Sequence, residues 1–216
     1  MLEEASGLAA TFSLDGDKDI PSDGEPHRFR VLGKEVLPDL ALVAAPLLEP
    51  TVYQVARFTA PSAFPLFPGS PVVHFVGGQR LGQAPLSPPS AGRPFELGFG
   101  PHKAMRVTFE RVERKQAEVG AFTKERQWTL RERFVVSSGD GEARDVEVQD
   151  RMLKPTSDKV KVELLPTTTA GWREATPGVR TWTVKLAPQA STTLTLDHQI
   201  RAPKDGELEG LPELDQ

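Results

Sequence analysis

One group of carboxylates has a spacing that could bind a metal. Asp15, Asp17 and Asp19 alternate like the first ligands of a helix–loop–helix calcium site. That kind of site also needs a glycine at its sixth position and a glutamate at its twelfth. The chain has Ile20 and Pro26 at those positions. The segment therefore predicts a solvated turn rather than a calcium site.

The histidines do not form a recognisable catalytic or metal-binding pair. None of the four follows a spacing such as H-E-x-x-H. His198 is in phase with Leu196 and Ile200, which predicts a hydrogen-bonded histidine in the core. His102, next to Lys103, lies in an expected turn between two halves of the chain, where ligands often bind. The other two histidines are His27 and His74.

One carboxylate is expected to point into the protein. Asp150 is in phase with Val148 and Met152, which alternation places on an inward face. A carboxylate in such a position needs a partner, so an ion pair or a strand-end hydrogen bond is expected. Hydrolysis of a glycan by this residue would need a second carboxylate that the fold brings close to it.

The motifs of common enzyme classes are missing. With no cysteine, the chain has no thiol nucleophile, disulfide or zinc ribbon. No G-x-S-x-G turn presents a serine nucleophile, and no G-x-x-x-x-G-K-[ST] loop could hold a phosphate. The sequence therefore predicts no catalytic, cofactor-binding or metal-binding residues, and favours a non-enzymatic role.

Charge and hydropathy argue against two kinds of partner. The 216 residues include 26 basic and 30 acidic side chains, so no basic excess favours nucleic acid. No segment approaches the ~18 apolar residues of a spanning helix, and direct membrane insertion is not expected. Residues 1–7 lack the basic and apolar regions of a signal peptide. A complete chain is then expected in the cytoplasm, and a fragment of a secreted parent in the cell envelope or periplasm.

Short apolar runs between the 20 prolines and 18 glycines indicate β-structure throughout. Residues 40–47 are nearly all apolar and are expected to be buried on both faces. Gly77 and Gly78 suit a hairpin turn that needs positive φ. From Met105 to Ile200, further sets of residues share faces at a period of two. The sequence predicts an all-β fold of antiparallel β-sandwiches, with an immunoglobulin-like second half.

Four segments are expected along the chain. Residues 1–10 form an N-terminal extension, compatible with the end of an upstream helix. Residues 11–102 form a first β-rich half, and residues 103–203 form a second, β-sandwich half. Residues 204–216 form a loosely held acidic tail.

A charged segment in the second half predicts a long, projecting hairpin arm. Residues 105–112 and 127–136 flank Gly120 almost symmetrically, and a short helix within residues 111–126 is the alternative. Mixed charge is an ordinary protection of a strand edge. An apolar tip would instead contact a protein partner or a second copy of the chain. The residues expected in such a contact are Val119, Phe122, Arg114, Lys115, Lys124 and Arg126.

A series of short motifs carries a family resemblance. In chain order they include residues 45–53 (APLLEPTVY), 65–69 (PLFPG), 95–100 (FELGFG), Thr181-Trp182 and Leu186-Ala187-Pro188. In this order the motifs resemble the C-terminal domain of the mucoidy-inhibitor (MuiA-like) family, a domain of unknown function. The resemblance covers the chain from about Phe12 to Leu211.

The resemblance implies a bacterial, β-rich C-terminal domain that normally follows an N-terminal domain and a coiled coil. It also implies an influence on capsule or exopolysaccharide production, without an established biochemical activity or catalytic residues. The family tends to have an acidic residue soon after the FELGFG strand. This chain has Pro101-His102-Lys103 there, so a site that depends on that carboxylate is not expected.

Three functions remain open from the sequence. The favoured one is a non-enzymatic protein-interaction or scaffolding module, linked to envelope polysaccharide through the resemblance. The alternative is a glycan- or peptide-acting hydrolase that uses carboxylates assembled by the fold. A third is a purely structural domain that holds a coiled-coil partner in place.

Overall fold

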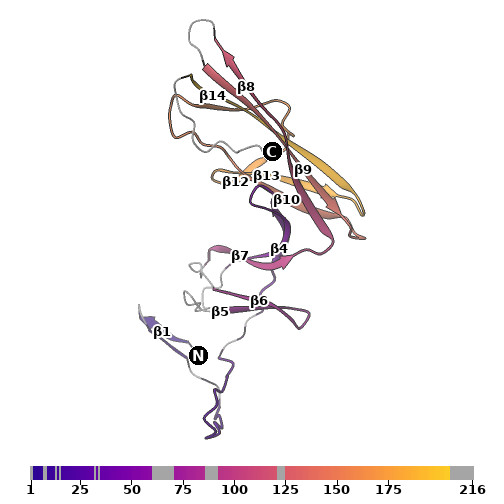
Figure 1. Ribbon diagram of the computed structural model, residues 1–216. Helices are drawn as coiled ribbons and strands as arrows, with labels where there is room; N and C mark the ends of the chain where they lie inside the picture. The colour runs from indigo at the N-terminus through magenta and orange to yellow at the C-terminus, as the bar shows by residue number, and fades with distance from the viewer. Residues whose placement is uncertain are drawn as a thin grey trace. The chain divides into compact units, whose positions relative to one another are not determined.

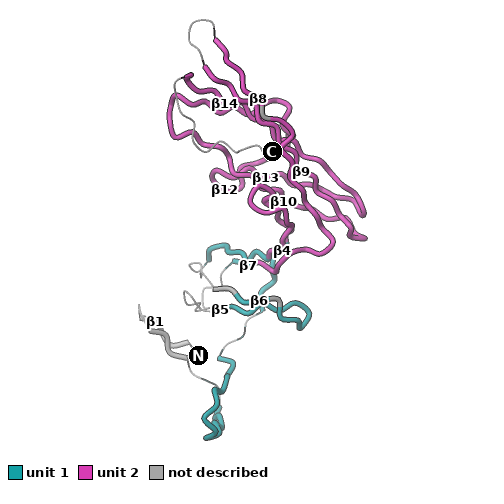
Figure 2. The backbone as a smooth tube through the Cα atoms, viewed as in Figure 1, with its two compact units in different colours: residues 1–40, 56–97 teal, residues 41–55, 98–216 magenta. Residues whose placement is uncertain are grey.

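The computed structural model describes residues 2–6, 9–12, 14, 16–31, 33, 35–59, 71–85, 92–120 and 125–204. Every regular element in these ranges is a β-strand, which confirms the predicted all-β fold (Figure 1). The chain forms two compact units (Figure 2). Unit 1 is made of residues 1–40 and 56–97, and unit 2 of residues 41–55 and 98–216.

Unit 1 contains two separate two-stranded antiparallel sheets. The pairs are β1 (Leu2–Ser6) with β2 (Ala9–Phe12), and β5 (Pro71–Val76) with β6 (Gln79–Pro85). Gly77 and Gly78 join β5 to β6 with φ angles of 55° and 80°. This geometry confirms the predicted hairpin turn, because only glycine adopts such angles at little cost.

Two larger sheets carry the remaining strands. The six-stranded sheet has the order β12 (Arg173–Thr176), β13 (Val179–Leu186), β10 (Arg144–Arg151), β3 (Asp39–Ala45), β4 (Glu49–Thr59) and β7 (Pro94–Pro101). The four-stranded sheet has the order β11 (Lys161–Leu164), β14 (Ser191–Pro203), β9 (Glu125–Ser138) and β8 (Met105–Val119). β10 pairs antiparallel with β13 but parallel with β3, and this parallel pair was not predicted.

The hydrophobic core of unit 2 combines residues of both larger sheets. Val107, Phe134 and Leu196 come from the four-stranded sheet, and Val148 and Trp182 come from the six-stranded sheet. The ring centroids of Phe134 and Trp182 lie 6.4 Å apart. The two-residue alternation therefore places its apolar side chains between sheets, as predicted, while the immunoglobulin-like arrangement stays a prediction.

Strand β3 is less buried than its apolar sequence predicts. Ala44 is buried, but Leu40 is 74% exposed and Leu47, just beyond the strand, is 39% exposed. The prediction of burial on both faces is therefore wrong at the ends of this run. An apolar run shows strand propensity, but it does not show which faces the rest of the fold covers.

The predicted long hairpin is confirmed and the helix alternative is wrong. β8 and β9 pair antiparallel from Met105–Ser138 to Val119–Glu125, with a bulge between Arg111 and Glu113. Along its other edge β9 pairs with β14, as far as Pro203 opposite Glu125. The hairpin is therefore one side of a ribbon formed by β8, β9 and β14, and β11 pairs along part of the other edge of β14 (Figure 1).

A second hydrophobic cluster lies on this ribbon. Trp128 and Leu130 of β9 and Ile200 and Ala202 of β14 are buried together, and Val160 and Val162 pack against them. Among the described residues, none from the six-stranded sheet belongs to this cluster. It gives the distal part of the ribbon a small core of its own.

Candidate functional site

A layer of buried charged and polar side chains separates the two hydrophobic clusters. Glu132 of β9, Asp150 of β10, Arg180 of β13 and His198 of β14 are each less than 5% exposed. Along both β9 and β14, the charged position lies between residues of the main core and residues of the second hydrophobic cluster. Alternation places all four on inward faces, since each is in phase with buried apolar neighbours. We call this set, with Arg111, the buried charged layer.

Asp150 and Arg180 form the centre of the layer. They face each other in the register of β10 and β13, and Arg180 Nη1 donates to Asp150 Oδ2 at 2.7 Å. The guanidinium of Arg180 also lies over the rings of Trp172 and Trp182, at 5.0 and 5.7 Å from their centroids. The predicted ion pair of Asp150 is thus confirmed, and two indole faces further stabilise the cation.

Burial changes the protonation equilibria of this pair. Removal from water raises the pKa of Asp150 to about 6, with a smaller rise from the charge of Glu132 and an opposing effect of Arg180. Burial also lowers the pKa of Arg180, against the opposing effect of Asp150. A buried ion pair contributes little net stability, but loss of one partner leaves an uncompensated charge.

Glu132 has its own arginine. Arg111 of β8 donates to Glu132 Oε1 from Nη2 at 3.0 Å and from Nε at 3.3 Å. Burial raises the pKa of Glu132, and the hydrogen bond and charge of Arg111 oppose that rise. Asp150 and Glu132 are therefore two electrostatically coupled carboxylates, each bonded to a different arginine.

His198 is held neutral within the layer. Burial and the nearby charge of Arg180 lower its pKa to about 4, and the charge of Asp197 opposes this shift. Among the described residues, neither of its ring nitrogens has a hydrogen-bond partner. Its predicted position in the core is confirmed, but the prediction that it is hydrogen-bonded there is wrong.

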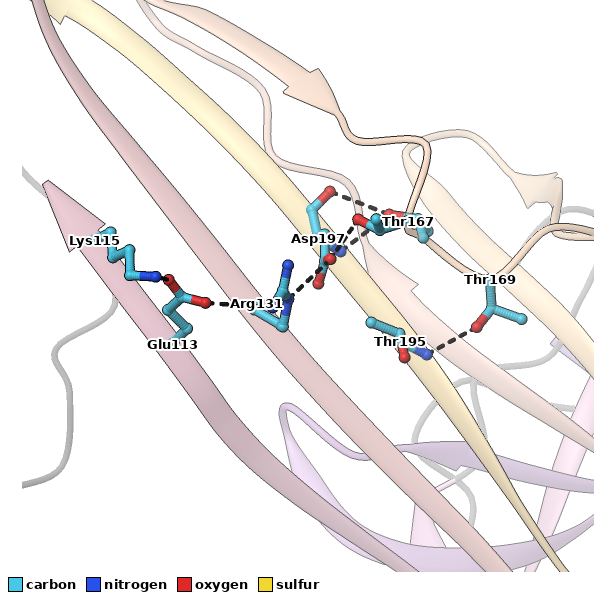
Figure 3. A network of polar contacts seen from close by, with 8 residues as sticks. Glu113, Lys115, Arg131, Thr167, Thr169, Thr195 and Asp197 are labelled. Carbon is cyan, nitrogen blue, oxygen red and sulfur yellow. Dashed lines mark hydrogen bonds and ion pairs between the residues drawn. The ribbon is translucent and has the colours of Figure 1, made fainter. Parts of the chain in front are cut away.

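The opposite face of the ribbon carries a chain of polar contacts (Figure 3), which runs from the surface to Asp197, a fully buried carboxylate. Exposed Lys115 pairs with Glu113, and Glu113 accepts from Arg131 at 3.3 Å. Arg131 Nε in turn donates to Asp197 Oδ2 at 3.1 Å. Thr167 donates to the same oxygen at 2.5 Å. Asp197 is thus fixed by charge-assisted bonds from two directions.

Threonine side chains cover the edge of β14 next to Asp197. Thr168 Oγ1 accepts from the N–H of Asp197 at 3.0 Å and donates to its carbonyl at 3.1 Å. Thr169 Oγ1 accepts from the N–H of Thr195 at 2.8 Å (Figure 3). These hydroxyls therefore bond the backbone groups that an adjacent strand would otherwise engage.

The residues predicted to contact a partner lie on the ribbon as far as they are described. Val119 ends β8 opposite Glu125, and Lys115 is 76% exposed in its side chain. Arg114 stands opposite Leu130 in the register, and Arg126 stands in β9 opposite Ala202. Phe122 and Lys124 lie outside the described residues. His102 directly follows β7; its N–H donates to the carbonyl of Val52 at 2.8 Å, and its Nδ1 accepts from the N–H of Ala104.

Sequence reasoning missed most of the buried charged layer. Glu132 is in phase with Leu130 and Phe134, so a charged residue in an apolar series was a signal that could have identified it. Arg180 is likewise in phase with Trp182. That Asp150 meets Arg180 could not be deduced, because β10 and β13 are not consecutive strands.

The carboxylates of Glu132 and Asp150 do not face solvent. Among the described residues, no group of three or more histidine, aspartate or glutamate side chains could hold a metal ion. The described part of the chain also has no helix long and apolar enough to cross a membrane. The arrangement defines an all-β domain with paired charges inside it and a long strand at one edge.

The comparisons with known proteins assign a family. The family described as Domain of unknown function (DUF4139) matches residues 2–204, and the chain belongs to it. No curated protein and no solved structure matches the chain.

Proposed function

We propose that the chain is a non-enzymatic protein-interaction or scaffolding module that presents its β8–β9 hairpin to a protein partner. The observation that carries this proposal is the construction of the ribbon. β8 is a 15-residue edge strand, and it is supported by β9, β14 and the second hydrophobic cluster. Such a strand is a platform for partners that recognise an edge or a projecting tip.

The resemblance to the MuiA-like family adds a biological setting to this proposal. A module of this kind would act in the regulation of envelope polysaccharide through contacts with other proteins.

The test is affinity capture with the full-length parent protein as bait. A second bait carries Val119→Asp and Phe122→Asp, and a control bait carries Arg173→Glu on strand β12, away from the hairpin. Proteins recovered by the unchanged bait and the control, but lost with the hairpin variant, would support the proposal. Recovery of the same set by all three baits would contradict it.

One observation favours a second candidate, a hydrolase that acts on glycan or peptide. Asp150 and Glu132 are coupled carboxylates, and burial raises the pKa of both. Such pairs are frequent in active sites, although structural ion pairs show the same shifts. Turnover of a glycan or peptide panel by the purified chain, abolished by both Asp150→Asn and Glu132→Gln, would favour the hydrolase. No turnover by the unchanged chain would remove it.

A further inference from the structure

The outer edge of β8 is regular from Glu113 to Val119. A bulge precedes this segment and Gly120, with a φ of 100°, follows it. Among the described residues, β8 pairs only with β9. An edge strand of this kind exposes a row of backbone N–H and C=O groups that another strand can pair with.

The other edges of the two larger sheets are less suited to strand addition. The outer side of β14 is covered by β11 and by Thr168 and Thr169. β7 begins with Pro94 and ends with Pro101, and proline cannot donate a ladder hydrogen bond. β12 has only four residues. The edge from Glu113 to Val119 is therefore the one that offers a long, regular pairing surface in the described part of these sheets.

The charges on this edge do not repel an incoming strand. The segment has two acidic residues, Glu113 and Glu118, and two basic residues, Arg114 and Lys115. Glu113 is already paired with Arg131. The segment carries no net charge, so a strand with the same mixed charges can pair with it in a register that places opposite charges together.

We propose that a second copy of this chain pairs antiparallel with the segment from Glu113 to Val119, around a two-fold axis at Gln116. This inference rests on the proposed interaction role and names the partner. An axis normal to the sheet makes the residue at the centre face its own copy. Centres at Arg114, Lys115 or Glu118 would place identical charges opposite each other, which is unfavourable.

A centre at Gln116 instead makes two favourable charge pairs. Arg114 of each copy then stands opposite Glu118 of the other, and the two Gln116 residues face each other. A centre at Ala117 pairs no opposite charges. Glu118 now contacts Lys204 at 2.9 Å, but both side chains are about half exposed, so rearrangement costs little.

Pairing over one short segment creates a small interface. Interfaces at the low end of the size range belong to weak, transient complexes. The expected behaviour is therefore a reversible monomer–dimer equilibrium that depends on concentration, and not an obligate dimer.

Sedimentation velocity of the purified full chain, between about 1 µM and about 1 mM, tests the proposal. The unchanged chain is expected to shift from monomer to dimer across this range. Glu118→Arg is expected to weaken dimerisation about tenfold or more, because it places Arg114 opposite a second cation. Combining Arg114→Glu with Glu118→Arg is expected to restore it. Glu110→Arg, which lies outside the paired segment, is the control and should leave the dimerisation constant unchanged.

Several results would overturn the self-pairing. They are a chain that stays monomeric throughout, a dimer unaffected by Glu118→Arg, or a charge swap that fails to restore dimerisation. Tryptophan fluorescence confirms that each variant is folded. A monomeric chain whose hairpin still determines the proteins captured by the parent bait would contradict the self-pairing but not the proposed function, so the two failures are distinguishable.

Discussion

The buried charged layer makes a quantitative prediction about stability and pH. In the folded chain the pKa of Asp150 is raised to about 6 from 3.8, so the stability that this shift supplies is fully present below pH 3.8 and is lost as pH rises through 6. The pKa of His198 is lowered to about 4 from 6.5, so its contribution is present above pH 6.5 and is lost as pH falls through 4. The two groups therefore act in opposite directions over the same range.

The two contributions are of similar size. Each pKa moves by roughly two units, and one unit corresponds to ~1.4 kcal/mol, so each group alone changes the free energy of unfolding by about 3 kcal/mol. In the unchanged chain they oppose each other between about pH 4 and 6, and the raised pKa of Glu132 acts in the same direction as that of Asp150. Removal of either group should expose the slope that the other produces.

His198→Leu should make the free energy of unfolding rise as pH falls from 6.5 to 4, by up to about 3 kcal/mol relative to the unchanged chain. Asp150→Asn should make it fall over the same range. Asp150→Asn also removes the charged partner of Arg180 above about pH 6, where Asp150 is ionised in the unchanged chain, so the absolute stability of this variant changes as well. The informative quantity is therefore the slope with pH and not the absolute value.

Urea unfolding at constant ionic strength, followed by tryptophan fluorescence, measures these slopes. The three tryptophans, Trp128, Trp172 and Trp182, all belong to unit 2, so the signal reports on the unit that contains the layer. His102→Gln, a histidine outside the layer, is the matched control. The reasoning is refuted if the free energy of unfolding of His198→Leu depends on pH as it does in the unchanged chain. It is also refuted if both variants change this pH dependence in the same direction.

Three further substitutions test how the domain is held together. Arg180→Met should lower the free energy of unfolding by about 3–5 kcal/mol, because it leaves Asp150 buried and unpaired. In urea titrations, adding Asp150→Leu should recover most of this loss. If the double variant shows no recovery, the pairing is contradicted. Thr168→Val should lower the free energy of unfolding by about 1–3 kcal/mol and speed hydrogen exchange of the Asp197 amide, because the N–H and C=O of Asp197 each lose a hydrogen bond to the hydroxyl. Unchanged exchange of this amide would show that Thr168 does not protect the edge of β14. Leu130→Ala should cost about 2–5 kcal/mol, and a smaller loss would show that the second hydrophobic cluster contributes little.

The strands and their faces could be predicted because alternation is a local property. The β8–β9 hairpin followed from the symmetry of apolar residues around Gly120, and the β5–β6 turn followed from Gly77-Gly78. The apolar phase also gave the inward position of His198. Each of these features depends on residues that are close in sequence.

The rest depends on contacts between distant segments. The bond between Asp150 and Arg180 joins residues 30 positions apart, and the bond between Arg131 and Asp197 joins residues 66 positions apart. No local pattern encodes such pairs, and alternation does not distinguish the parallel partner of β10 from an antiparallel one. The cover of β14 by Thr168 was missed because a hydroxyl that replaces a strand has no periodic signal.

Hydrogen–deuterium exchange in β8 tests most directly whether the edge of this strand is an association surface. The amides of residues 113–119 that point away from β9 should exchange rapidly in dilute protein and become protected as the concentration rises, while amides of the main core stay unchanged. Equal exchange of these amides at low and high concentration would contradict the account.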